Sequence, residues 1–480
     1  MKHCAEKIVC LVIFLFSVNS FWAQERESGY VCRYGFTFEI STQKSWGYGK
    51  PVVLSVTPNT SADAAGLKAN DIIDSLNGKD TKGYSSDDIF MWLQNSDDRV
   101  ELKISNLKEK NRELHLNRYC KLSNAITEKD LASVYSFYSL ESVRSQMFSC
   151  PFKIQINPDI DLLNYETFAF TEVEPNNQEL EQAINSSLKK VLEEKGLTES
   201  IVRPDLIVHT YYSYSKNPNY KPSGNTDKLP LENRYNMNTK TWETLPVFLN
   251  PLIHSNQAQF LLKFGIRLID PKKSMGENMY VVWELEANEL LKSNYPLTNY
   301  AQFHIPLMLM NYPYPKSTED PQYYYSRTNH NYTGINFNMD NMKEIVDVDF
   351  SASAEEAGIN IGDIIEKING IKFENNTKSA GNKYKQFILK TNHLRDPKTQ
   401  FTNADGFSRC MYWDKMKYVQ VSDEFRKPEH ATAFSYLFYF EPYINLSETN
   451  ILHFDIKRGT KKLTIRIKPI IVTEEIFENR

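Results

Sequence analysis

Short runs of apolar residues, separated by polar turn residues, predict strands in the first quarter of the chain. The runs at Val52–Val56, Val100–Ile104 and Arg112–Leu116 have the length and composition of strands. Ser85–Leu93 is expected to form a helix, because Ser85 can cap its start and acidic residues occupy its first turn. The pattern therefore predicts several strands and a short helix in this region.

A similar arrangement of apolar and polar positions occurs twice. Ala65–Gly78 aligns without a gap with Ala357–Gly370, and in both windows a short helix ends at a glycine, a strand follows, and Asn-Gly forms a tight turn. A second shared element lies upstream, at Gly35–Phe38 and Gly334–Phe337, and each is expected to begin a strand. The repeat predicts two related modules, one near each end of the chain.

The combined pattern resembles the PDZ domain, with Ser61 and Ala62 fitting it in the first copy and Ser353 and Ala354 in the second. The resemblance implies PDZ-like, partly open β-barrels with short helices at residues 28–118 and 328–473. In the second copy the closing strands come late, so we expect an insertion at about 374–449.

The resemblance also implies a binding mode, in which an extended peptide adds as a strand to a sheet edge and backbone N–H groups of a turn hold a carboxylate. Ser86 stands where many PDZ domains carry histidine, so the preference for the terminal residue stays undefined. The alternative is that the chain's own segments fill the groove. The expected peptide-binding residues are Tyr34, Gly35, Phe36, Thr37, Phe38, Ser86 and Phe90 in the first copy, and Thr333, Gly334, Ile335, Asn336 and Phe337 in the second.

Residues 150–318 are expected to form a central α/β domain. An alternating strand at Tyr165–Phe170 precedes an amphipathic helix at Asn177–Lys195, and further strands begin at Pro204 and Phe260. This order resembles a family of exported bacterial domains of unknown function. Residues 119–149 are expected to be a helical connector, with a helix from Thr127 to Met147.

The first residues have the layout of a secretory signal peptide. Lys2 and Lys7 precede an apolar stretch at Ile8–Val18, and small and polar residues follow. The stretch is about half the roughly 20 residues that a membrane-spanning helix needs. We therefore expect a signal peptide at 1–24, no transmembrane span, and a protein exported to the periplasm or beyond the cell.

Composition narrows the function further. The 480 residues exceed one ordinary domain, and a net charge of −4 gives no field that would attract nucleic acid. Cys32, Cys120, Cys150 and Cys410 follow the expected signal peptide, and no C-x-x-C pair is present. In the PDZ layout Cys32 and Cys120 lie on neighbouring strands, so we hypothesise a disulfide between them.

Sequence motifs of known catalytic chemistry were sought because PDZ domains often accompany proteases. The chain contains no G-x-S-x-G, H-E-x-x-H or D-[ST]-G motif and no nucleotide-binding G-x-x-x-x-G-K-[ST] loop, and its nine histidines are scattered. We therefore expect no catalytic residues, no metal and no cofactor.

These observations predict an α+β multidomain protein that is exported, is not an enzyme, and captures peptide or protein tails, either C-termini or internal extended segments. Its oligomeric state is left open. One alternative is a divergent hydrolase, or an accessory subunit of an envelope protease. Another is a glycan-binding protein whose insertion stacks aromatic rings on sugars, although packing in the core or between domains is the favoured explanation of such rings. The aromatic residues concerned are Tyr412, Trp413, Phe434, Tyr436, Phe438, Tyr439 and Phe440.

Overall fold

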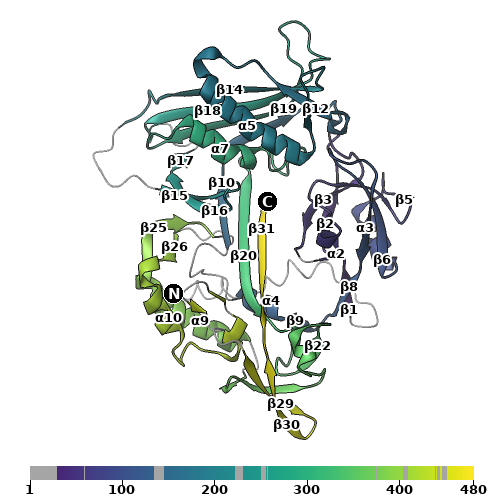
Figure 1. Ribbon diagram of the computed structural model, residues 1–480, viewed down its shortest axis with the longest axis vertical. Coiled ribbons are helices and arrows are strands. Elements are labelled where there is room, and N and C mark those ends of the chain that lie inside the picture. The colour runs from purple at the N-terminus through teal and green to yellow at the C-terminus, as the bar shows by residue number, and fades with distance from the viewer. Residues whose placement is uncertain are drawn as a thin grey trace, which may run out of the picture.

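The computed structural model describes residues 30–479, except 59, 135–144, 222–230, 250–255, 257, 374–376, 404–408, 438, 441–443 and 446–450. The expected signal peptide lies outside these residues. Three lobes surround a long central pair of strands, with the first module on the right of the view and the central domain at the top (Figure 1). Among the helices described, none has the length and apolar character needed to cross a bilayer.

The first module is a mainly antiparallel sheet with two short helices. Its sheet has the order β2-β3-β4-β6-β7, so β2 lies at one edge. Val53, Ile73, Leu102 and Leu116 form its core together with Ile89 of α3. Its elements are β1 (Tyr30–Arg33), β2 (Phe36–Ile40), β3 (Pro51–Val56), α2 (Ser61–Ala64), β4 (Ile72–Leu76), β5 (Lys79–Asp80), α3 (Ser86–Asn95), β6 (Arg99–Ser105) and β7 (Arg112–Asn117).

Helix α3 begins where the sequence indicated. The Ser85 side chain accepts the N–H of Asp88, and the Asp88 carboxylate accepts the N–H of Ser85, which completes a capping box. Ile89 and Leu93 are buried, whereas Met91 between them is 42% exposed. The helix therefore packs one face on the sheet and presents the other to solvent.

A loop between β2 and β3 joins the first module to the central domain. Trp46 in this loop is fully buried in the same core cluster as Tyr165 and Tyr312 of the central domain. Hydrogen bonds reinforce the contact, since Leu162 N–H donates to the Ser45 carbonyl at 3.0 Å. The two units consequently share one core.

The segment between these units differs from the expected helical connector. It contains β8 (Tyr119–Leu122), β9 (Ala125–Thr127), α4 (Glu128–Val134) and β10 (Ser145–Ser149). The expected helix from Thr127 to Met147 is therefore wrong at its C-terminal end, where β10 pairs with another strand. Apolar residues in this segment are buried by partners far away in the sequence, which a local pattern cannot reveal.

The central domain is an α/β unit, as expected. Its sheet has the order β11-β19-β18-β14-β12-β13, with β17 beside β19, and α5 and α7 cover one face (Figure 1). Its elements are β11 (Phe152–Ile156), β12 (Thr167–Phe170), α5 (Gln178–Lys195), β13 (Thr198–Glu199), β14 (Leu206–Lys216), β15 (Leu231–Asn236), β16 (Thr241–Pro246), β17 (Phe248–Leu249), β18 (Phe260–Ile269), β19 (Val281–Leu291) and α7 (Leu297–Met308).

A three-stranded sheet links the central domain to the second module. β20 (Gln322–Tyr332) lies between β10 and β31 (Ile470–Asn479), and β20 and β31 run side by side through the middle of the molecule (Figure 1). All ten residues of β31 pair with β20. The second module was expected to end at 473, but its last strand continues to Asn479.

The second module repeats the element order of the first. β21 and β22 are followed by a short helix, the β23–β24 hairpin, a longer helix and two closing strands. The residues expected as an insertion, about 374–449, contain this longer helix and all the elements between it and the closing strands. The elements are β21 (Ile335–Asn338), β22 (Ile345–Val348), α8 (Ser353–Glu356), β23 (Ile364–Ile368), β24 (Ile371–Lys372), α9 (Thr377–Thr391), β25 (Arg395–Phe401), β26 (Cys410–Trp413), α10 (Tyr418–Phe425), β27 (Tyr439–Phe440), β28 (Ile444–Asn445), β29 (Leu452–Arg458) and β30 (Lys461–Ile467).

Candidate peptide-binding grooves

The first groove lies beside the edge strand β2. β2 pairs with β3 on its inner side, and within the described part of the chain no strand pairs with its outer side. Phe36 and Phe38 are partly buried against the core that α3 also covers, with ring centroids 6.2 Å apart. Thr37 is exposed, and its hydroxyl lies 2.6 Å from that of Ser55. The edge could therefore accept a further strand, as the sequence predicted.

The turn before β2 has the geometry of a carboxylate-binding loop. Gly35 has a φ of +94°, and a Cβ there would lie 2.2 Å from Thr60 Oγ1, so no other residue fits without displacing Thr60. The Gly35 carbonyl accepts the N–H of Thr57 at 2.8 Å. Among the described residues, the N–H groups of Tyr34 and Gly35 donate to no acceptor. These two donors are available for an anion.

The side chains predicted around this turn have different roles. Tyr34 is buried, and its hydroxyl donates to the Leu93 carbonyl of α3 at 3.2 Å, while burial raises the pKa of the phenol above its usual value. Tyr34 thus ties the turn to the helix and can offer a ligand only its backbone N–H. Ser86 begins α3, and Phe90 is partly buried one turn further on.

The second groove is occupied by the chain itself. β9 pairs antiparallel with β21, with Asn336 opposite Thr127, Phe337 opposite Ile126 and Asn338 opposite Ala125. β21 therefore has a neighbour on both sides, β22 and β9. The alternative that the chain's own segments fill a groove holds for the second copy. Of the residues predicted there, Asn336 and Phe337 pair with this internal segment, and Thr333 and Gly334 bond to the residue that follows it, Glu128.

The carboxylate of Glu128 lies in the turn that precedes β21. Thr333 N–H and Gly334 N–H donate to Oε2 at 2.7 and 3.0 Å. The hydroxyls of Thr333 and Tyr436 lie 2.6 Å from Oε1. Gly334 has a φ of +90°, which matches the conformation of Gly35 in the first turn. An internal side chain thus takes the place that a terminal carboxylate takes in a PDZ domain.

The two oxygens of Glu128 are not equivalent. Oε2 faces backbone N–H groups, which can only donate, whereas Oε1 faces two hydroxyls that can reverse their roles and accept a hydrogen bond from the protonated carboxyl. Glu128 is 1% exposed. This burial raises the pKa of its carboxyl to about 7, although the hydrogen bonds from Thr333, Tyr436 and Gly334 act in the opposite direction. The geometry accommodates both protonation states.

The docking of Glu128 should therefore depend on pH. A folded-state pKa of about 7 lies above the ordinary value of 4.5, so the stabilisation is full below about 4.5 and is lost as the pH rises through 7. We expect the free energy of unfolding of the wild type, relative to Glu128→Gln, to fall by about 3 kcal/mol between pH 5 and pH 8. Urea titrations at both pH values measure it, and a difference that does not change with pH would contradict this assignment.

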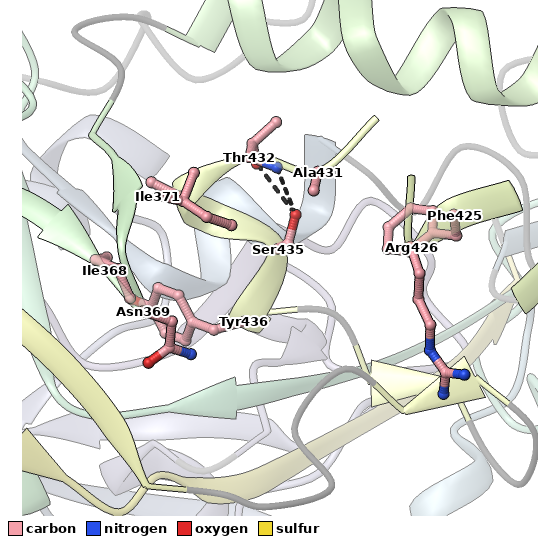
Figure 2. A pocket seen from close by; sticks show the side chains of 10 residues that line it. Ile368, Asn369, Ile371, Phe425, Arg426, Ala431, Thr432, Ser435 and Tyr436 are labelled. Carbon is pink, nitrogen blue, oxygen red and sulfur yellow. Dashed lines mark hydrogen bonds between the residues drawn. The ribbon is translucent and has the colours of Figure 1, made fainter. Parts of the chain in front are cut away.

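A pocket of about 160 Å³ lies next to the second groove (Figure 2). Ile368 and Ile371 line one side, and the Thr432 N–H donates to Ser435 Oγ at 2.7 Å within it. Tyr436 also lines the pocket, while its hydroxyl reaches Glu128. Ligand pockets usually measure 300 to 1,000 Å³, so this one is too small for an ordinary ligand.

Three of the seven aromatic residues named for the insertion form core. Trp413, Phe434 and Tyr436 are between 0% and 4% exposed and belong to the core of the second module. Their faces are covered by protein and cannot stack on a sugar. Core packing therefore explains these three rings, while Phe438 lies outside the described residues.

A buried polar cluster occupies the interior of the central domain. Arg234 NH1 lies 2.6 Å from His304 Nε2, and its NH2 lies 3.6 Å from Glu289 Oε2. The Tyr300 hydroxyl donates to Glu289, and Arg234 also pairs with Glu232 at 2.6 Å. Burial lowers the pKa of His304 and raises that of Glu289 to about 7. Arg234, Glu289, Tyr300 and His304 are at most 2% exposed, so in this conformation they cannot contact a dissolved substrate.

One group of side chains has the spacing of metal ligands. Ligand atoms of Glu424, Glu429 and His430 lie within 4.8 Å of one another. However, Lys390 Nζ lies 2.5 Å from Glu429 and 3.8 Å from Glu424, and Lys427 contacts Glu424 as well. Because lysines neutralise both carboxylates, we assign the group as an ion-pair cluster.

The cysteines agree with the sequence hypothesis as far as they are described. Cys120 is disulfide-bonded, and the residue opposite it in the β1–β8 pair is Cys32. Cys150 and Cys410 are free and buried. The pairing of Cys32 with Cys120 stays a prediction that peptide mapping can test.

Comparison with known proteins agrees with the architecture. The PDZ domain family matches residues 52–106, and a domain of unknown function, DUF4136, matches residues 153–314. This chain is thus a PDZ domain protein with a DUF4136 domain. A crystal structure of a PDZ domain protein from Parabacteroides distasonis is 43% identical, covers 94% of this chain and 100% of that chain, and has a TM-score of 0.81. The chain belongs to the family of that protein.

Other comparisons add nothing to this assignment. No curated protein matches the chain. The photosystem II D1 C-terminal processing protease is 13% identical and covers 41% of this chain and 50% of its own, with a TM-score of 0.17. PelC from Paraburkholderia phytofirmans is 12% identical and covers 34% of this chain and 92% of its own, with a TM-score of 0.15. Similarity at this level carries no argument.

The sequence did not reveal the occupant of the second groove. Glu128 and Tyr436 come from segments about 200 and 100 residues away from the turn that they contact. The only local signal was a capping pattern, in which the Thr127 side chain and Asp130 bond each other's backbone N–H groups. That pattern predicts the start of a helix and says nothing about its neighbours.

Proposed function

We propose that the protein is an exported, non-enzymatic interaction protein whose first PDZ domain captures an extended peptide. The observation that carries the proposal is the outer edge of β2, which lies next to a turn whose backbone N–H groups have no acceptor among the described residues. A peptide could pair with β2, and its carboxylate could bind the N–H groups of Tyr34 and Gly35. Either a C-terminus or an internal extended segment meets these requirements.

The second module is proposed to be a further PDZ-like domain. Its support is the shared element order together with the two matching turns, Gly35 at +94° and Gly334 at +90°. The arrangement of β9 beside β21, with Glu128 in the turn, is that of a bound ligand. The second module thereby serves as an internal example of the binding mode proposed for the first.

The enzyme alternative has less support. The most densely polar cluster of the central domain, around Arg234 and Glu289, is buried and held together by its own ion pairs. Such an arrangement fits a structural role. Broad hydrolase assays on the purified chain test this part of the proposal, and turnover would overturn it.

Export is proposed from the first residues, where Lys2 and Lys7 precede the apolar stretch. N-terminal sequencing of the protein recovered from the producing cell tests this part. A mature chain that begins between residues 21 and 25, found outside the cytoplasm, is expected. An uncleaved N-terminus would contradict it.

Peptide binding by the first groove can be tested with a library of C-terminal and internal peptides, with affinities measured by fluorescence polarisation on the full mature chain. Phe90→Ala should weaken the affinity of a selected peptide at least about tenfold, because the ring is placed to line the groove and about 1.4 kcal/mol corresponds to that factor. Met91→Ala is the matched control, because Met91 is 42% exposed on the other face of α3. Equal loss in both variants, or no saturable binding, would contradict the proposal.

A further inference from the structure

The geometry points to a second, closed peptide site. We propose that residues 125–128, here called the closing segment, block the groove of the second module. An external peptide with the same binding groups binds in the groove when the closing segment leaves it. The proposal rests on the PDZ-like character of the second module. The external ligand would be an extended segment that carries a carboxylate.

The contacts of the closing segment are those of a ligand. Three residues, Ala125 to Thr127, form the whole strand that pairs with β21. The next residue supplies the carboxylate, which accepts hydrogen bonds from Thr333 N–H, Thr333 Oγ and Gly334 N–H. None of these contacts requires the segment to be covalently joined to the module, so another chain could make them equally well.

The strand of the closing segment is short, whereas the helix that follows it, α4, places Leu131 and Ala132 in the core of the second module. Ala125, Ile126 and Thr127 are each partly exposed, and only Glu128 is buried. Its strand is much shorter than β20 and β31, which pair over ten residues. Segments with short ladders and few buried apolar contacts open at lower free energy than core strands. The opening proposed here is confined to residues 125–128, while Leu131 and Ala132 of α4 stay in the core.

Covalent connection gives the closing segment an advantage over a free ligand. A linked ligand has an effective concentration on the order of millimolar when its linker is short. A free peptide of micromolar affinity would therefore displace only a small fraction of the docked closing segment. The second site is thus expected to bind poorly in the resting protein and well once the docked carboxylate is removed.

The test uses a probe of known chemistry. An amidated, fluorescein-labelled peptide with the sequence of residues 121–130, KLSNAITEKD, is titrated into the full mature chain. Glu128→Ala should bind the probe at least about tenfold more tightly than the wild type, because the internal competitor has lost its carboxylate. The matched control probe carries glutamine in place of its own Glu128 and should bind weakly to both proteins.

A second variant assigns the binding to the correct groove. Thr333 is fully buried, and its hydroxyl donates a hydrogen bond to the carboxylate. The double variant Glu128→Ala with Thr333→Val should therefore lose the increased affinity for the probe. The double variant Glu128→Ala with Phe90→Ala should keep that increased affinity. If the double variant with Phe90→Ala loses the increased affinity, the probe binds in the first groove and the proposal is wrong.

Folding of each variant is checked by thermal unfolding, and Glu128→Gln replaces Glu128→Ala if the latter does not fold. If the folded variants bind the probe no more tightly than the wild type, the closing segment is a permanent strand of the module and the proposal is wrong. A failure of peptide binding in the first groove alone leaves this result unaffected, so the two proposals can fail separately.

Discussion

Arg234→Met should lower the free energy of unfolding by about 3 to 5 kcal/mol, because it leaves the buried Glu289 without its cationic partner. Arg234 is 2% exposed, and it contacts Glu232, Glu289 and His304 at once. Its guanidinium also lies 4.4 Å from the centre of the Phe248 ring. Urea unfolding of the purified chain, followed by circular dichroism, measures the loss.

The control for this prediction is the double variant Arg234→Met with Glu289→Gln. The amide removes the charge that Arg234→Met leaves unpaired, so the double variant should recover part of the stability. If the stability loss of the double variant equals the sum of the losses of the two single variants, packing around Phe248 stabilises this region and charge pairing does not. Arg234→Met with wild-type stability would contradict the role of the cluster altogether.

Trp46→Ala should cost about 3 to 5 kcal/mol, which is the usual cost of deleting a fully buried tryptophan. Trp46 has no exposed surface, and its indole N–H donates to the Asn70 carbonyl at 2.9 Å. Because the ring lies in a core shared with Tyr165 and Tyr312, its loss should also loosen the first module from the central domain. Urea unfolding measures the stability, and limited proteolysis detects the loosening.

Tyr48 in the same loop provides the matched control, since its side chain is 55% exposed. Tyr48→Ala should change the stability by less than about 0.5 kcal/mol. If Trp46→Ala unfolds no earlier than Tyr48→Ala, the loop does not connect the two units. If Trp46→Ala is unstable but no more sensitive to protease between the first module and the central domain, Trp46 stabilises only the first module.

The sequence was informative where the residues acted locally. The capping box at Ser85 and Asp88, the positive φ of Gly66 and Gly358, and the closing strands β29 and β30 all follow from residue types at short spacing. The same local pattern occurs twice, so the sequence predicted these local features in two modules. Family comparison confirms the PDZ assignment at 52–106 and the central domain at 153–314.

The parts that the sequence did not reveal depend on contacts across long distances. β9 is only three residues long, and it is a strand because β21 lies beside it. β31 is long because β20 offers ten partners. The hairpin of β15 and β16 carries Arg234 into the core. In each case a distant partner decides the structure, and local propensity does not record it.

The candidate site also has parts that the sequence predicted and parts that it did not. The donors of both turns were expected from the resemblance to PDZ domains, which assigns them to the turns at Gly35 and Gly334. Their occupants were not, because a carboxylate that reaches a turn 205 residues away leaves no local trace. Peptide binding by the second groove stays a prediction, and the structure adds that residues 125–128 of the chain itself lie there.

The long strand β20 has a mechanical consequence. Its last residue, Tyr332, is followed directly by Thr333 and Gly334, the donors of the second turn, while its first half pairs with β10 next to the central domain. β31 pairs with β20 over ten residues, and β10 pairs with its first half on the other side, so one continuous strand connects the turn to the central domain. Ligand exchange in the turn and binding at the central domain would be coupled only as far as each displaces this strand, and the coupling would then be equal in both directions.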